Sequence, residues 1–120
     1  MMNYYIDFIT KKATDKLTSF EKVKMIIRRV RNNRVLILEA GLTSEEEAEL
    51  IKQTMMVIDF DNFIGVEFFN WERKKSEHNR LFKRNSTDNK YTVVAPTEAV
   101  NVIEDSQELL SLEIMPVLSS

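Results

Sequence analysis

The chain has 120 residues, of which 43% are hydrophobic and 30% charged, and its formal net charge of −2 is ordinary for one globular domain. It contains no cysteine, which excludes disulfides, thiolate catalysis and cysteine-ligated zinc sites. No apolar run approaches the ~20 residues needed to span a bilayer, so we expect a single cytoplasmic domain over residues 1–120 without a membrane segment.

The N-terminal part of the chain predicts a strand, a helix and a second strand. Residues 4–9 are rich in aromatic and β-branched side chains, which favours a strand. Thr18 and Glu21 form the pattern of a capping box and predict that the first helix begins there. Its apolar positions recur at helical spacing and define the face expected to be buried: Phe20, Val23, Ile26, Ile27 and Val30. Residues 34–39 contain an uninterrupted apolar run, typical of a central strand covered on both faces.

A second capping-box pattern, Thr43 with Glu46, predicts a second helix over residues 43–59. The side chains expected on its inner face are Leu50, Ile51, Thr54, Met55 and Ile58. The remaining elements are expected in the order strand, strand, short helix and strand, over residues 63–69, 91–95, 97–104 and 109–115.

The predicted order is β-α-β-α-β-β-α-β, an α+β fold with a mixed sheet of about five strands and three helices. From residue 34 on, this is the ferredoxin-like split βαβ order, preceded by an extra strand and helix. Right-handed crossovers would put the second and third helices on one face of the sheet. Because the strands at 34–39 and 63–69 are apolar on both faces, the first helix is expected to cover the opposite face, at least in part.

Several segments resemble an archaeal family of uncharacterised small cytosolic proteins, classed as a domain of unknown function. They are Val35–Ala48, Thr54-Met55, Ile58-Asp59, Phe63–Glu67 and Tyr91–Pro96, together with the closing strand. The resemblance covers nearly the whole chain. Genes of that family tend to neighbour an Era-like GTPase and a small zinc-ribbon protein. The resemblance implies no catalytic residues, and it favours a GTPase or ribosomal-RNA context.

Motifs for catalysis and cofactor binding are absent from the sequence. With Gly41 and Gly65 as the only glycines, no phosphate-binding loop or dinucleotide motif can be written. The single histidine, His78, is expected to be an exposed loop residue. Four glutamates near the start of the second helix are expected to stabilise its dipole rather than to bind a divalent cation: Glu45, Glu46, Glu47 and Glu49. Glu39 and Glu67 leave a small carboxylate site open, but the chain is expected to be non-enzymatic, without cofactor or metal.

Positive charge is concentrated in two segments. Residues 1–34 hold nine basic against three acidic residues and residues 71–90 seven against three, whereas 35–70 hold one against eight and 91–120 none against five. The first segment supplies the candidate binding residues Lys24, Arg28, Arg31 and Arg34, while Lys22 and Arg29 are expected on the outermost line of the first helix. The second segment, expected to be a mobile loop insertion, supplies Trp71, Arg73, Lys74, Lys75, Arg80, Lys83 and Arg84, with Phe82 beside them.

Basic residues interleaved with aromatic ones suit phosphate contact combined with base stacking. The sequence therefore predicts a binding module that associates with RNA through the first helix and the 71–90 loop, provided that the two segments share a surface. An RNA-recognition motif is not supported, because the central strands lack the required aromatic residues. The alternatives are a protein-interaction adaptor for an Era-like GTPase and a homo-oligomeric structural protein. The two basic segments also fit a solvated helix face and a surface loop, or a surface that docks on acidic patches of a partner or a second copy.

Overall fold

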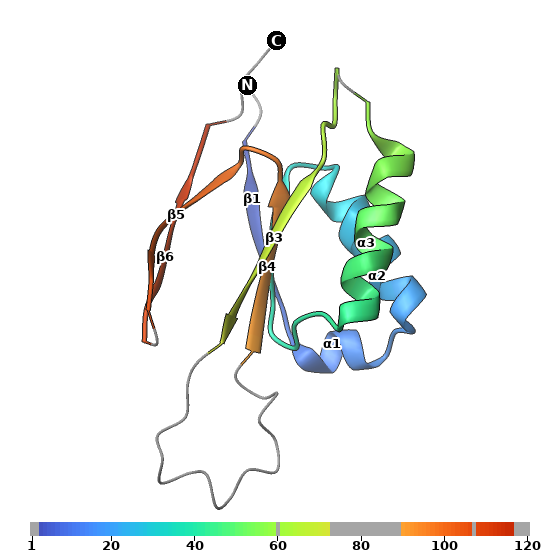
Figure 1. Ribbon diagram of the computed structural model, residues 1–120, viewed down its shortest axis with the longest axis horizontal. Helices are drawn as coiled ribbons and strands as arrows, with labels where there is room; N and C mark the ends of the chain where they lie inside the picture. Colours follow the sequence, from blue (N-terminus) through green and yellow to red (C-terminus); the bar gives the residue numbers. More distant parts are fainter. Residues whose placement is uncertain (1–2, 60, 73–89, 107, 117–120) are drawn as a thin grey trace, which may run out of the picture.

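The computed structural model describes residues 3–59, 61–72, 90–106 and 108–116. Over these residues the chain forms three helices and six strands, which confirms the α+β class and the mixed sheet (Figure 1). The elements are β1 (Tyr5–Ile9), α1 (Lys11–Asp15), α2 (Ser19–Val30), β2 (Arg34–Leu38), α3 (Ser44–Val57), β3 (Val66–Glu72), β4 (Lys90–Pro96), β5 (Val100–Asp105) and β6 (Leu110–Ile114).

Four strands form the main sheet in the order β1-β2-β4-β3. β1 pairs in parallel with β2, and β4 pairs antiparallel with both β2 and β3. β2 and β3 therefore run in the same direction with β4 inserted between them, which confirms the predicted split βαβ unit. β1 occupies the position next to β2 where a ferredoxin-like order would place the closing strand, so the beginning of the chain completes the sheet.

The helix predicted over residues 97–104 is wrong. This segment contains β5, which forms a two-stranded antiparallel sheet with β6. Glu98 adopts a left-handed φ of 74° and Ala99 N–H bonds to the carbonyl of Pro96 at 3.0 Å, so a turn separates β4 from β5. The residues after this turn include Val100, Val102 and Ile103, and β-branched side chains favour a strand. The segment is so short that the spacing of its apolar residues fitted a helix equally well.

Both long helices lie on one face of the main sheet and the β5–β6 hairpin lies on the other (Figure 1). The expectation that the first helix covers the opposite face is therefore wrong. The connections β1-α1-α2-β2 and β2-α3-β3 both advance across the sheet in the same direction. Right-handed crossovers that advance in one direction place their helices on the same face. This topology brings α2 and α3 side by side.

Local sequence signals set the beginnings of the two long helices. Thr18 Oγ1 accepts the N–H of Glu21, and Thr43 Oγ1 accepts the N–H of Glu46, each at 3.1 Å. In both helices the glutamate carboxylate accepts the N–H of the capping threonine in return, so both predicted capping boxes are confirmed.

The buried faces of these helices are narrower than predicted. On α2 the buried apolar residues are Val23, Ile26, Ile27 and Val30, whereas Phe20 is 53% exposed. On α3, Leu50 and Thr54 are buried, but Ile51 and Met55 are 49% and 71% exposed. A helix that packs on one face of a sheet buries only a narrow stripe of its own surface. Phe20, Ile51 and Met55 lie outside this stripe.

Candidate nucleic-acid interface

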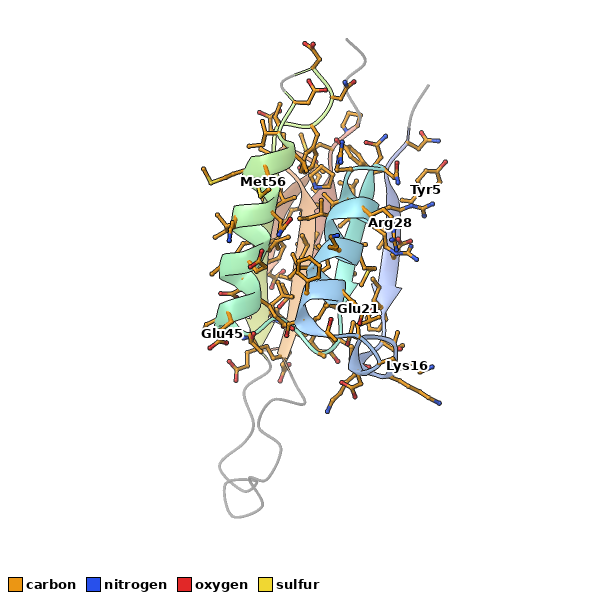
Figure 2. All side chains as sticks on the ribbon, turned by 90° about the vertical axis from the view of Figure 1, so that its right-hand side faces the viewer. Tyr5, Lys16, Glu21, Arg28, Glu45 and Met56 are labelled. Carbon is orange, nitrogen blue, oxygen red and sulfur yellow. The ribbon has the colours of Figure 1, made fainter. Side chains whose placement is uncertain are left out.

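An open groove of about 490 Å³ runs between α2 and α3, and we call it the basic groove. Its lining consists of Lys24, Ile27, Arg28, Arg31, Asn32, Gln53 and Val57. Figure 2 faces the helix layer, with α2 running from Glu21 towards Arg28 and α3 from Glu45 towards Met56, so the two helices run in the same direction. The structure thus brings three of the predicted binding residues to one surface feature: Lys24 and Arg28 of α2, and Arg31 at its C-cap.

The three cations of the basic groove differ from the other basic residues of α2 in their partners. Within the described part of the chain, Lys24, Arg28 and Arg31 form no ion pair, whereas Lys22 and Arg29 are both paired with acids. The part of its lining that the described residues form contains no aspartate or glutamate. Because helical residues at i, i+4 and i+7 lie on one face, the three cations form a line along the groove.

One acid borders the C-terminal end of this line. The side-chain hydrogen bond from Asn62 and the backbone N–H of Asp61 hold the pKa of Asp59 below its ordinary value, with a smaller contribution from the charge of Arg31. Asp59 is thus ionised at neutral pH and limits the positive surface at this end. Cations in the last turn of a helix also stabilise the helix dipole, which is a structural reason for basic residues there.

Arg34 lies outside the basic groove. Its Nη1 donates to Asp7 Oδ1 at 3.2 Å, and its guanidinium lies 4.6 Å from the centroid of the Tyr5 ring. The other carboxylate oxygen of Asp7 accepts from Arg29 Nη1 at 3.0 Å. Asp7 therefore links β1 to both α2 and β2, and Arg34 is used within the fold.

Phe20 is the surface residue that the sequence analysis missed. The Nζ of Lys24 lies 4.8 Å from the centroid of its ring, so the ring adjoins the line of cations. Hydrophobic spacing alone placed Phe20 in the core. The available signal was its position: Phe20, Lys24 and Arg28 follow one another at intervals of four residues, as side chains on one helix face do.

The second basic segment contributes one described candidate, Trp71. Its indole Nε1 donates to the carbonyl of Ser106 at 2.7 Å, and its ring lies 5.6 Å from that of Tyr91. Trp71 therefore ties β3 to the β5–β6 hairpin, on the sheet face opposite the basic groove. The other candidates of the segment lie outside the described residues: Arg73, Lys74, Lys75, Arg80, Lys83 and Arg84, with Phe82 and His78. The predictions that they form a mobile loop and share a surface with α2 remain predictions.

A buried ion pair holds the two long helices together outside the basic groove. Lys22, expected on the outer line of its helix, is 8% exposed, and its Nζ lies 3.0 Å from Glu46 Oε1 and 2.7 Å from the carbonyl oxygen of Gly41. Burial acts to raise the pKa of Glu46, but the hydrogen bond from Thr43 and the ammonium of Lys22 outweigh it, so that the pKa lies below its ordinary value. The pair joins α2 to the start of α3.

The described residues contain no group of three histidine, cysteine, aspartate or glutamate side chains that could hold a metal ion.

Glu39 and Glu67 were the candidates for a carboxylate site. Glu39 Oε1 accepts the N–H of Lys11 at 2.6 Å, at the start of α1. Glu39 follows the end of β2 whereas Glu67 lies near the start of β3, and the two strands run in the same direction. The two carboxylates therefore lie at opposite ends of the sheet and do not form a common site.

Within the same described ranges, no helix has the length and apolar character required to cross a bilayer.

No curated protein and no solved structure matches the chain. A family model described as origin-associated protein OapB does match, and the description names no enzymatic activity. The match extends over residues 14–115, which contain α2, α3 and the whole basic groove, and the chain therefore belongs to the OapB family.

Proposed function

We propose that this protein is a non-enzymatic binding module that holds the phosphate backbone of a nucleic acid, RNA in the first instance, against the basic groove. The observation that carries the proposal is the line formed by Lys24, Arg28 and Arg31. Among the described residues, none of the three has an ion-pair partner and no carboxylate lines the groove. The description of the family as origin-associated is in keeping with a nucleic-acid partner.

The arrangement of the cations suits a polyanion better than a small anion. A helix rises about 1.5 Å per residue, so the three side chains are spread over about 10 Å along the axis of α2. A small anion is bound by cations that converge on one point, whereas these follow a line. Nucleic-acid strands carry phosphates every few ångströms, and a line of this length can contact about three of them.

The acidic first turn of α3 limits where on the helix layer a strand can lie, through the exposed Glu45 above all, since Glu46 is paired with Lys22. The first turn of α3 contains Glu45, Glu46 and Glu47, and Figure 2 shows Glu45 at the end of the helix layer away from Arg28. Like charges repel, so a phosphate backbone is disfavoured at the start of α3 and favoured along α2. The net charge of −2 makes non-specific attraction weak, and binding depends on this local surface.

The test is a salt titration of affinity for a labelled single-stranded RNA, an RNA hairpin and a DNA duplex. In the triple variant Lys24→Ala, Arg28→Ala and Arg31→Ala, we expect affinity for RNA to fall by roughly ten- to a hundredfold. The slope of log affinity against log salt should become shallower by about two to three units, because about one unit is lost for each phosphate contact. Fluorescence anisotropy between about 50 and 200 mM salt measures both quantities.

The matched control is the triple variant Lys12→Ala, Lys16→Ala and Lys52→Ala, which removes the same charge from exposed positions outside the basic groove. This control should bind within about threefold of the wild type, since distant surface charges are largely screened. Equal losses of affinity in the two triple variants would show that binding depends on net charge and not on the basic groove. Unchanged affinity in the groove variant would refute the proposal. Tighter binding to the DNA duplex than to RNA would assign the groove to DNA.

A second candidate function, a protein-interaction adaptor or homo-oligomeric module, is favoured by an exposed apolar surface on β1. Ile6 and Phe8 are 58% and 57% exposed, on the sheet face that the β5–β6 hairpin leaves uncovered at this edge. Exposed apolar side chains on an edge strand are typical of protein contacts.

For this candidate we expect the double variant Ile6→Thr and Phe8→Thr to abolish binding to the Era-like GTPase that the family resemblance implies, or to abolish self-association. Pull-down with the GTPase in its GDP and GTP states, together with sedimentation over a range of concentrations, measures both. A monomeric wild type that binds the GTPase in neither state would remove the candidate, whatever the outcome with RNA.

A further inference from the structure

Phe20 is an exposed aromatic side chain at the head of the line of cations on α2. It is 53% exposed, and the Nζ of Lys24 lies 4.8 Å from the centroid of its ring. At about 1.5 Å per residue, Phe20 lies about 16 Å from Arg31 along the helix axis, so the ring and the three cations form one continuous strip.

Neither helix capping nor core packing explains an aromatic residue at this position. Phe20 is the second residue of α2, whose capping box is formed by Thr18 and Glu21. A hydrophobic staple would use the residue before the cap and the fourth helical position, which are Leu17 and Lys22. Phe20 is in neither position and belongs to neither buried cluster of the fold. Its contact with Lys24 leaves more than half of the side chain open to a ligand.

An aromatic ring beside a line of cations is the combination that recognises single strands. Proteins that bind single-stranded nucleic acids stack unpaired bases on aromatic rings while basic residues follow the backbone. In a duplex the bases are stacked on one another, so no base face is free to meet a ring. A surface that binds only phosphates needs cations, and an exposed aromatic ring such as that of Phe20 would not contribute to it.

We infer that the basic groove takes a single-stranded nucleic acid, with one unpaired base stacked on Phe20 and the adjoining phosphates on Lys24, Arg28 and Arg31. This inference rests on the proposed function. It adds that the ligand is single-stranded and that Phe20 is the residue that distinguishes a single strand from a duplex. Val57 contributes a partly exposed apolar side chain to the groove beside the cations, above the buried Ile27. Val57 thus extends the surface against which the strand can pack the edges of its bases.

The variant Phe20→Leu tests this inference, because leucine keeps an apolar side chain but removes the ring. We expect its affinity for a single-stranded RNA of about 16 nucleotides to fall by roughly five- to a hundredfold, the loss that removal of one base-stacking contact causes. Its salt slope should stay that of the wild type, since no phosphate contact is lost. Its affinity for an RNA duplex of the same length should not change. Phe20→Trp keeps a ring and should restore binding to the single strand.

Thermal unfolding of Phe20→Leu should match that of the wild type within a few degrees, because the side chain is exposed. Equal losses for single strand and duplex would overturn the selection of single strands. Unchanged binding by Phe20→Leu, with a loss in the triple variant of Lys24, Arg28 and Arg31, would overturn the role of Phe20 and leave the proposed function intact. Unchanged binding by both variants would overturn both proposals.

Discussion

Replacing Lys22 by alanine should lower the free energy of unfolding by about 3–5 kcal/mol, measured by urea denaturation at neutral pH. The side chains of Lys22 and Glu46 are only 10% and 6% exposed, so removing the ammonium leaves a buried carboxylate without its partner. The carbonyl of Gly41 loses its contact with Lys22 at the same time. A loss below about 1 kcal/mol would show that water solvates the pair and that it does not hold α2 to α3.

The matched control combines Lys22→Met with Glu46→Gln. Glutamine retains the capping interaction with Thr43, and neither charge remains, so most of the lost stability should return. The dependence of stability on pH provides an independent check of the ion pair, and the direction of the change can be stated. Because the pKa of Glu46 is below its ordinary value of 4.5, its contribution is complete above about pH 4.5 and is lost as the pH falls through the lower folded-state value. The double variant should therefore lose less stability than the wild type on acidification.

Truncating Leu36 to alanine is the second change with a large expected effect, a loss of about 2–5 kcal/mol. Leu36 is fully buried on β2, where it pairs with Val94 of β4 and packs under the helix layer. Neighbouring elements on both sides of β2 hold the site open, so the cavity cannot collapse freely. Urea denaturation with an unchanged m-value would measure the loss.

Ile103→Ala is the matched control for this second prediction, since it truncates an aliphatic side chain that is 62% exposed on β5. Its effect should stay within about 0.5 kcal/mol. Similar losses at Leu36 and Ile103 would contradict the assignment of β2 to the centre of the core.

Features with a local cause could be predicted from the sequence. Both capping boxes join residues three positions apart, and both helices begin where Thr18 and Thr43 indicate. The line formed by Lys24, Arg28 and Arg31 follows from helical geometry alone. The structure adds the second wall, from Gln53 and Val57 of α3, which no spacing in α2 could indicate.

Features decided by distant contacts could not be predicted in this way. Residues 97–104 suited either a short helix or a strand, and pairing with β6 decides for the strand. Arg34 shared the pattern of a binding residue, yet its partner Asp7 lies 27 residues away in the sequence. Phe20 had the spacing of a core residue, but hydrophobic periodicity does not show how wide a stripe of the helix the neighbouring layer covers.

The insertion of β4 between β2 and β3 has a consequence for how the chain folds as it is synthesised. β4 carries the buried residues Thr92, Val93, Val94 and Ala95 at the centre of the sheet, yet it is made after both of its neighbours and both walls of the groove. Until residue 96 has left the ribosome, β2 and β3 have no strand to join them, and the apolar undersides of α2 and α3 cannot be fully covered. Because domains generally fold as units, we expect the nascent chain to complete its fold only after β4 has emerged.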